Sequence, residues 1–186
     1  MRHLASTLIA IALLAPSSAF AAVNSATMTI ATPAPRSTVG DGSRMMLGSI
    51  RINSAARVNI RTLYVELNAE PVRGQFLDPS LHSIVESLQL KNVSTGRRIP
   101  GVEGEGVLTG KKQSIVYVFN DFTTNNDTWQ IQLDLRSRKT PLNIRTRFFG
   151  SESKSEWKAR AEDLESGDPI VLKPELLEMR WTKVRK

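Results

Sequence analysis

Few side chains in this sequence belong to the types that carry catalysis or bind transition metals. Cys does not occur among the 186 residues, which excludes thiol catalysis, thiolate metal sites and disulfide exchange. Beyond the N-terminal segment the chain has one histidine, His82, among the apolar residues Leu81, Ile84 and Val85. A lone imidazole cannot build a histidine metal site, and a catalytic triad would need partners that sequence cannot locate. We therefore expect His82 to be a structural residue.

Carboxylates offer two further kinds of chemistry. Asp121, Asp127 and Asp134 could supply a pair of acids for glycoside hydrolysis, but their pairing in space is not visible in a sequence. Asp121, Asn125 and Asp127 also place oxygen ligands in one inter-strand loop, as a Ca²⁺ site requires. Their spacing does not match an EF-hand, and turns rich in Asn and Asp are common between strands. We expect no cofactor or metal, with calcium as the alternative for this loop.

A glycine-rich segment could be read as a phosphate-binding loop. Gly101, Gly104 and Gly106 are interleaved with Glu103 and Glu105. Two carboxylates would repel a phosphate, and no Lys-Ser or Lys-Thr pair follows at the spacing of a P-loop. We expect a flexible hairpin loop here.

Basic and aromatic side chains are the better candidates for binding. The formal charge is +7, spread along the chain. Arg145 and Arg147 share the strand phase opposite to the apolar residues Leu142, Ile144 and Phe148, so both should face outward from one strand. Arg136 and Tyr64 are predicted to be exposed as well, the tyrosine as a platform for a sugar ring. In an exported protein the partners of such a surface are anionic polysaccharides or cell-envelope polymers rather than nucleic acid.

The N-terminus carries the parts of a secretory signal peptide. Arg2 precedes a short apolar run over residues 4–15, and Ala19-Phe20-Ala21 supplies the small residues that signal peptidase accepts. The run is shorter than the roughly 20 apolar residues of a membrane-spanning helix, and no second run follows. We predict cleavage after Ala21, export to the periplasm, the cell surface or the medium, and no transmembrane segment in the mature chain.

The mature chain has the length of one domain. Residues 22–43 are rich in Ser, Thr, Ala, Pro and Gly and are predicted to be an extended lead-in, with a short strand at 27–31. Residues 44–186 are predicted to form a single domain. The strands and turns of this domain must hold the candidate basic, aromatic and acidic side chains in place.

Alternation of apolar and polar residues predicts strands in that domain. The pattern is clearest over 129–135, where every second residue is apolar, and over 142–148, where Leu142, Ile144 and Phe148 repeat it. It is weaker at 46–52, 58–67, 87–92 and 115–119, and a phase change near Arg61-Thr62 predicts a β-bulge. Asp78 and Pro79 could open a short helix over 78–86. The expected fold is mainly all-β, an antiparallel two-sheet β-sandwich, Ig-like or jelly-roll-like, with at most one or two short helices.

Two segments stay open at this stage. Residues 153–166 fit either a strand or a helix, and the exposure of Trp157 within them is undecided. Leu177, Met179 and Trp181 share one strand phase, so a core strand is favoured over a detachable basic tail.

The order of the strand-like segments is similar to that of a known class of modules. The segments Leu47–Ile52, Ile60–Val65, Leu88–Asn92, Val118–Phe122 and Ile131–Leu135 resemble the β-sandwich modules of bacterial secreted and surface-associated proteins, over Leu47 to Phe149. The resemblance implies a structural role at the surface or outside the cell, and carries over no functional residue.

Three functions follow as hypotheses. The first is a secreted or surface-displayed, non-enzymatic protein acting in adhesion, surface structure or assembly, by self-association or with other surface proteins. The alternative is a binding module for anionic glycan that uses Arg145 and Arg147. The third is a carboxylate-based hydrolase.

Overall fold

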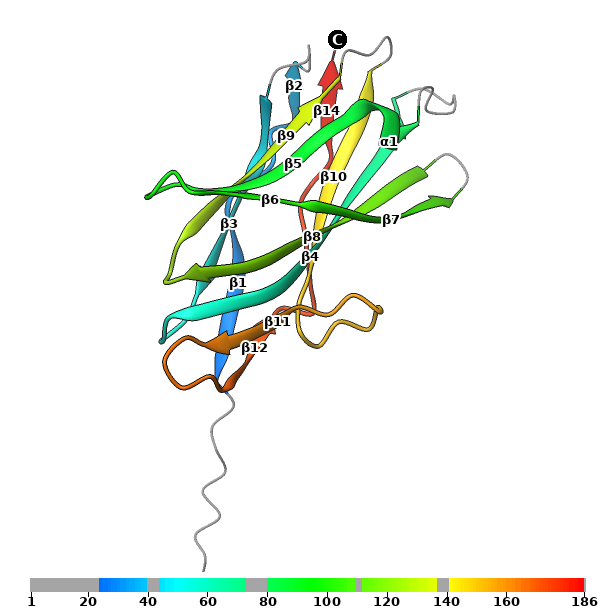
Figure 1. Cartoon of the computed structure of the whole chain (residues 1–186). Coiled ribbons are helices and arrows are strands. Elements are labelled where there is room, and N and C mark those ends of the chain that lie inside the picture. The colour runs from blue at the N-terminus through cyan, green and yellow to red at the C-terminus, as the bar shows by residue number, and fades with distance from the viewer. Residues whose placement is uncertain (1–23, 40–43, 73–79, 110–111, 137–140, 186) are drawn as a thin grey trace, which may run out of the picture.

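The computed structural model describes residues 24–39, 44–72, 80–109, 112–136 and 141–185, most of which lie in β-strands (Figure 1). The strands are β1 (Ser25–Thr32), β2 (Ser37–Val39), β3 (Arg44–Asn53), β4 (Val58–Pro71), β5 (Val85–Asn92), β6 (Arg98–Pro100), β7 (Val102–Thr109), β8 (Lys112–Thr124), β9 (Thr128–Leu135), β10 (Leu142–Phe149), β11 (Arg160–Asp163), β12 (Pro169–Lys173), β13 (Leu176–Glu178) and β14 (Thr182–Arg185). One short helix, α1 (Leu81–Ile84), has Ser80 as its N-cap residue. The predicted signal peptide and the Asp78-Pro79 helix start lie outside the described residues.

The two strands with the clearest sequence pattern are confirmed as β9 and β10. Along β9 every second side chain, beginning with Trp129, is buried, and β10 alternates in the same way from Leu142 to Phe148. Successive side chains of a strand point to opposite faces, so the apolar set of each strand enters the core and the polar set faces outward.

The predicted phase change in the fourth strand is also confirmed. Val58 and Ile60 are buried in one phase and Leu63 and Val65 in the other, with Arg61 exposed between them. The β4–β11 pairing shifts register at this point. An extra residue resets which side of a strand faces the core, and here that residue is turned outward.

The strands form one mixed hydrogen-bonded network in the order β2-β14-β10-β4-β11-β12-β1-β3-β9-β5-β6, with β8 and then β7 beyond β4, and β13 beside β10. The β1–β12 and β2–β14 pairs are parallel, and the other described pairs are antiparallel. The expected mainly β fold is therefore confirmed for the described residues. Two separate antiparallel sheets are not, because β12 pairs with β1 on one edge and β11 on the other. It thereby joins two strand groups, one made of β1, β3, β9, β5 and β6 and the other of β2, β14, β10, β13, β4, β8, β7 and β11.

The segment predicted as an extended lead-in is part of this network. β1 pairs with both β3 and β12, and β2 pairs with β14. Ala26 and Met28 of β1 are buried in the core. The strand predicted at 27–31 is thus longer and structurally integrated.

The glycine-rich segment predicted as a flexible loop is instead part of strand β7. At Gly101, the first glycine of this segment, the chain passes from β6, which pairs with β5, to β7, which pairs with β8. A Cβ atom at Gly101 would lie 2.8 Å from the Phe119 ring and 3.0 Å from the Leu88 carbonyl oxygen. The absence of a side chain there allows the crossing.

Both open segments contain strands. Residues 153–159 form turns and irregular chain and then β11 follows, so the helical alternative for 153–166 is wrong. The C-terminal segment forms β13 and β14 against β10, with a break between them. Met179 in the break is buried, whereas Trp181 is half-buried. The prediction of one continuous strand over residues 177–181 is therefore wrong, because β13 ends at Glu178 and β14 begins only at Thr182.

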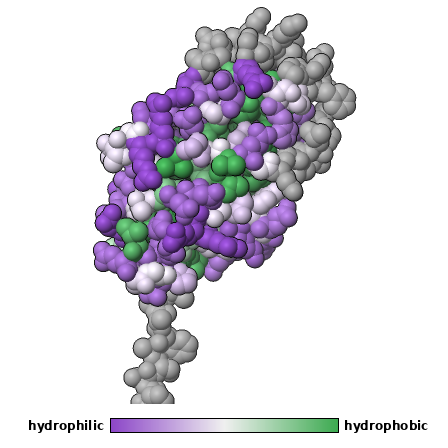
Figure 2. Space-filling view, viewed as in Figure 1, coloured by the Kyte–Doolittle hydropathy of each residue, from purple (hydrophilic) through white to green (hydrophobic). Residues whose placement is uncertain are grey.

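One hydrophobic cluster connects the two strand groups. Trp129 of β9 is fully buried, its ring 5.0 Å from that of Phe122 in β8 in an edge-to-face arrangement, and its indole N–H donates to Thr124 Oγ1 at 3.2 Å. The surface seen in Figure 2 is mostly hydrophilic, with small separate apolar areas. Among the described residues no helix is long and apolar enough to span a membrane.

Candidate functional site: a polar pocket on β8, β4 and β10

The candidate site is built on the outer face of β4, which lies between β8 and β10. Glu66 of β4 is opposite Arg147 of β10, and Asn68 is opposite Arg145. On the other side Asn68 is opposite Ser114 of β8. The intervening residues of β4 enter the core, so these polar side chains share the outer face.

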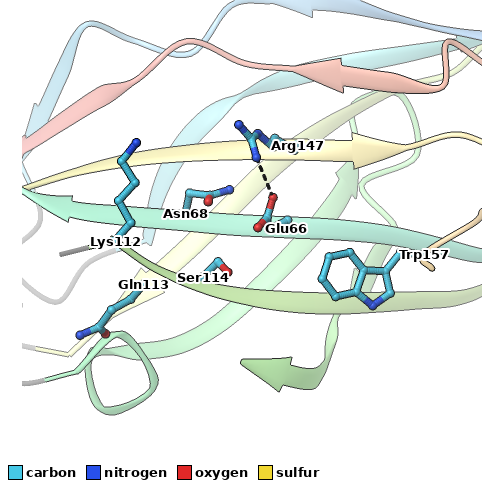
Figure 3. A pocket seen from close by; sticks show the side chains of 7 residues that line it. All are labelled: Glu66, Asn68, Lys112, Gln113, Ser114, Arg147 and Trp157. Atoms are coloured by element: carbon cyan, nitrogen blue, oxygen red, sulfur yellow. Dashed lines mark hydrogen bonds and ion pairs between the residues drawn. The ribbon is translucent and has the colours of Figure 1, made fainter. Parts of the chain in front are cut away.

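A pocket of about 260 Å³ lies on this face (Figure 3). It is lined by Glu66, Asn68, Lys112, Gln113, Ser114, Arg147 and Trp157. In Figure 3, Lys112 stands at one end and Trp157 at the other, with Asn68 and Glu66 between them. Trp157 comes from the segment between β10 and β11, and its ring centroid lies 5.4 Å from that of Phe149.

Ion pairs hold both arginines of the predicted basic strand. Arg147 donates to Glu66 at 3.3 Å and to Glu178 of β13 at 2.6 Å. Arg145 also pairs with Glu178, and its guanidinium carbon lies 4.4 Å from the centroid of the Trp181 ring. The Arg145 side chain is 13% exposed and that of Arg147 31%. Both face outward as predicted, but carboxylates and an indole ring cover much of their charge.

Two buried donors on this face have no hydrogen-bond partner among the described residues. They are Asn68 Nδ2 and Arg145 Nε, on residues directly opposite each other across β4 and β10. Buried polar groups are almost always hydrogen-bonded. The ammonium group of Lys112, which lines the same pocket, has no ion pair with a described carboxylate. The site therefore has donors and positive charge to offer, which favours an acceptor-rich ligand.

Tyr64 and Arg136 do not join this pocket. Tyr64 is on the same face of β4, opposite Phe149 and half-buried, but it does not line the cavity. Arg136 is exposed just after β9, where its backbone N–H donates to the Ile84 carbonyl. Of the four predicted binding residues, only Arg147 lines the pocket, and Arg145 lies beside it.

The three candidate catalytic aspartates are engaged separately. Asp121 pairs with Arg61 at 3.2 Å beside the β4 bulge. Asp134 accepts from Arg44 at 3.0 Å and from Ser87 at 2.7 Å. Burial raises the pKa of Asp134, but these hydrogen bonds outweigh it and hold the pKa below its ordinary value. An acid held ionised does not serve as a proton donor, so the arrangement gives no support to a paired-carboxylate mechanism.

The calcium alternative also lacks a shared set of ligands. Asp127 Oδ2 accepts from the Asn125 backbone N–H at 2.9 Å and from Thr124 Oγ1 at 3.3 Å, which closes the turn between β8 and β9. Asp121 is turned to Arg61 instead. Within the described ranges no three His, Cys, Asp or Glu side chains are grouped so that they could hold a metal ion. His82, expected to be structural, is exposed on α1 and pairs with Glu103 of β7.

Sequence reasoning did not find Glu66 and Asn68. Both interrupt an apolar stretch of β4 at alternate positions, which is the signal that could have marked them as outward polar residues. Their partners in β8 and β10 are far away in the chain, so only the strand register brings the pocket together.

Comparison with known proteins gives no family for this chain. No protein-family model matches it, and no curated protein matches it. Among solved structures it is similar to AvmM, described as catalysing macrocyclization in alchivemycin A biosynthesis, with 9% identity, a TM-score of 0.45, and coverage of 88% of this chain and 89% of that one. It is also similar to the ASH/PapD-like domain 7 of human CEP192, with 7% identity, a TM-score of 0.30, and coverage of 100% and 97%. Similarities this low assign neither a fold family nor an activity.

Proposed function

We propose that this protein is an exported, non-enzymatic domain that binds an anionic polysaccharide or cell-envelope polymer on the outer face of β8, β4 and β10. The observation that carries the proposal is the gathering of Lys112, Arg145 and Arg147 with two indole rings, those of Trp157 and Trp181, on or beside one sheet face. Flat aromatic rings offer apolar contact to the C–H faces of sugar rings, while the cations and amides reach the oxygen atoms.

The positive net charge of the chain supports an anionic polymer rather than a neutral one as the ligand. The net charge is +7, and losing Arg2 with the signal segment leaves +6. A positive potential concentrates polyanions near the surface and is weakened by salt. On the site itself, Arg145 and Arg147 are matched by Glu66 and Glu178, whereas Lys112 has no ion pair with a carboxylate of the described ranges.

We also propose the finer architecture and address as parts of this function. The two strand groups would face each other as an Ig-like sandwich, a proposal supported by the single cluster of buried residues that they share. Export to the periplasm or cell surface is supported by the signal-like residues 1–21. Adhesion or surface structure would then be the biological use of polymer binding.

The test is retention of residues 22–186 on immobilised polygalacturonate and heparin, eluted with increasing salt. Lys112→Ser should elute at clearly lower salt than the parent chain, since it removes a cation of this face that has no ion pair with a described carboxylate. Arg147→Ser should do the same, with its thermal midpoint measured alongside because Glu66 then loses a partner. The matched control is Arg51→Ser, which removes an exposed cation of β3 outside the pocket. Equal losses for Lys112→Ser and Arg51→Ser would reject the face as the binding site, and no retention of the parent would reject the function.

Self-assembly is a second candidate because of the strand edges. β6 and β2 end the strand order, and β7 pairs only with β8 among the described strands. Unpaired strand edges can recruit another chain. Light scattering after gel filtration over a hundredfold concentration range would decide, since assembly requires growing mass and a monomer throughout would reject it.

A further inference from the structure

We infer that the pocket between Lys112 and Trp157 binds one carboxylate-bearing sugar unit, a uronic acid, whose carboxylate lies against Lys112 and Asn68. The inference rests on the proposed function and names the unit of the polymer that the site would read. It is drawn from the size of the pocket, its charge and its unpaired donor.

The size of the pocket limits the ligand to one unit. Its volume is about 260 Å³, below the range of about 300–1,000 Å³ usual for pockets that hold drug-sized ligands. A polymer could therefore place one ring in the pocket, while the neighbouring units lie along the open sheet face. Trp157 at one end supplies an apolar surface for that ring.

The charge of the lining residues fits a single negative group. Lys112 and Arg147 contribute two positive charges and Glu66 one negative charge, which leaves a net charge of +1. Glu66 is bound to Arg147, and Lys112 is the lining cation that has no ion pair with any carboxylate in the described part of the chain. An incoming carboxylate is attracted to the Lys112 end and kept away from Glu66, whose oxygens remain acceptors for sugar hydroxyl groups.

The unpaired amide marks where the ligand oxygen would sit. Asn68 is 7% exposed, lines the pocket, and has a buried Nδ2 without a described partner. It lies opposite Ser114, and Lys112 is two residues before Ser114 on the same face of β8. Diagonal neighbours in a sheet lie within reach of long side chains. A carboxylate can therefore accept from the lysine and the amide together with two oxygens and a negative charge, and such charge-assisted hydrogen bonds are stronger than those of a neutral hydroxymethyl group.

The experiment titrates residues 22–186 with three monosaccharide probes, glucuronate, glucose and glucose 6-sulfate, following backbone amide shifts. We expect glucuronate to bind at least tenfold more tightly than glucose, with the largest shifts at residues 66–68 and 112–114. Asn68→Leu, which keeps the shape and removes the amide, should weaken glucuronate at least tenfold while polymer retention persists through the remaining charges. Asn143→Leu is the matched control, because Asn143 is half-buried on β10 outside the pocket, and its glucuronate affinity should not change.

The outcomes separate this inference from the proposed function. Equal binding of glucuronate and glucose, preference for the sulfate ester, or no binding of any probe would overturn the uronate site, even if the chain is still retained on the polymers. Unchanged glucuronate affinity in Asn68→Leu would overturn the role of the amide and indicate that water satisfies it. If the parent chain is not retained on either polymer, the proposed function itself is rejected.

Discussion

The C-terminal strands should be essential for stability, and removing residues 177–186 tests this. The truncation deletes β14 and most of β13. It removes Met179 and Val184, whose side chains are 1% and 0% exposed, and each is worth about 1.5–3 kcal/mol of burial. It also removes the Thr182 hydroxyl that donates to the Pro35 carbonyl at 2.7 Å, worth about 1 kcal/mol. The loss of about 4–7 kcal/mol is comparable to a net domain stability of about 5–15 kcal/mol.

The truncation also uncovers two backbone edges. β10 loses the partners that pair along Leu142–Ile144, and β2 loses β14. Exposed edges recruit other chains. We expect the truncated chain to aggregate, or to unfold more than about 10 °C below the parent, since about 1 kcal/mol shifts the midpoint by about 2–4 °C in a domain of this size. Circular dichroism melts with gel filtration measure both.

A pair of adjacent substitutions separates core packing from charge. Val184→Ala removes two buried methyl groups, about 2 kcal/mol at about 0.8 kcal/mol each plus a small cavity term, and should lower the midpoint by several degrees. Lys183→Ala changes an exposed neighbour on the same strand and should shift it by less than about 2 °C. A truncated chain that stays monomeric and melts within a few degrees of the parent would refute the reasoning and favour a detachable basic tail.

Two further predictions concern the backbone and pH. Gly150→Ala should prevent folding or destabilise the domain severely, because the new Cβ would lie 2.2 Å and 2.4 Å from two backbone carbonyl oxygens. In the control Gly167→Ala no atom lies within 4 Å of the new Cβ, so the domain should lose only the stability that corresponds to the strain of the positive φ. Equal thermal midpoints for the two variants would contradict this prediction. Asp134 has a folded pKa below its ordinary 3.8, so the stability it contributes is present above that value and is lost as pH falls through the folded pKa. The difference in unfolding free energy between the parent and Asp134→Asn, measured in denaturant, should therefore shrink below about pH 4, and a difference unchanged down to pH 2 would contradict the pKa assignment.

Local sequence patterns predicted the strands because inward and outward alternation is a property of each strand alone. β9, β10 and the bulge at Arg61 follow from the order of apolar and polar residues within a few positions. The break between β13 and β14 did not follow, since Met179 and Trp181 match a continuous strand phase and only their surroundings differ. Met179 is buried in the core, whereas Trp181 lies over Arg145.

The amino-acid sequence by itself determined that the chain is built of strands, that the polar residues of β10 face outward, and that no cysteine chemistry is available. Tertiary structure alone decided which strands are neighbours and therefore which polar residues meet. Glu66 and Arg147 are 81 positions apart and are joined only by the β4–β10 register, and β12 links both strand groups through pairings with β1 and β11. Strand pairing depends on contacts distant in the chain, whereas the alternation that makes a strand is local.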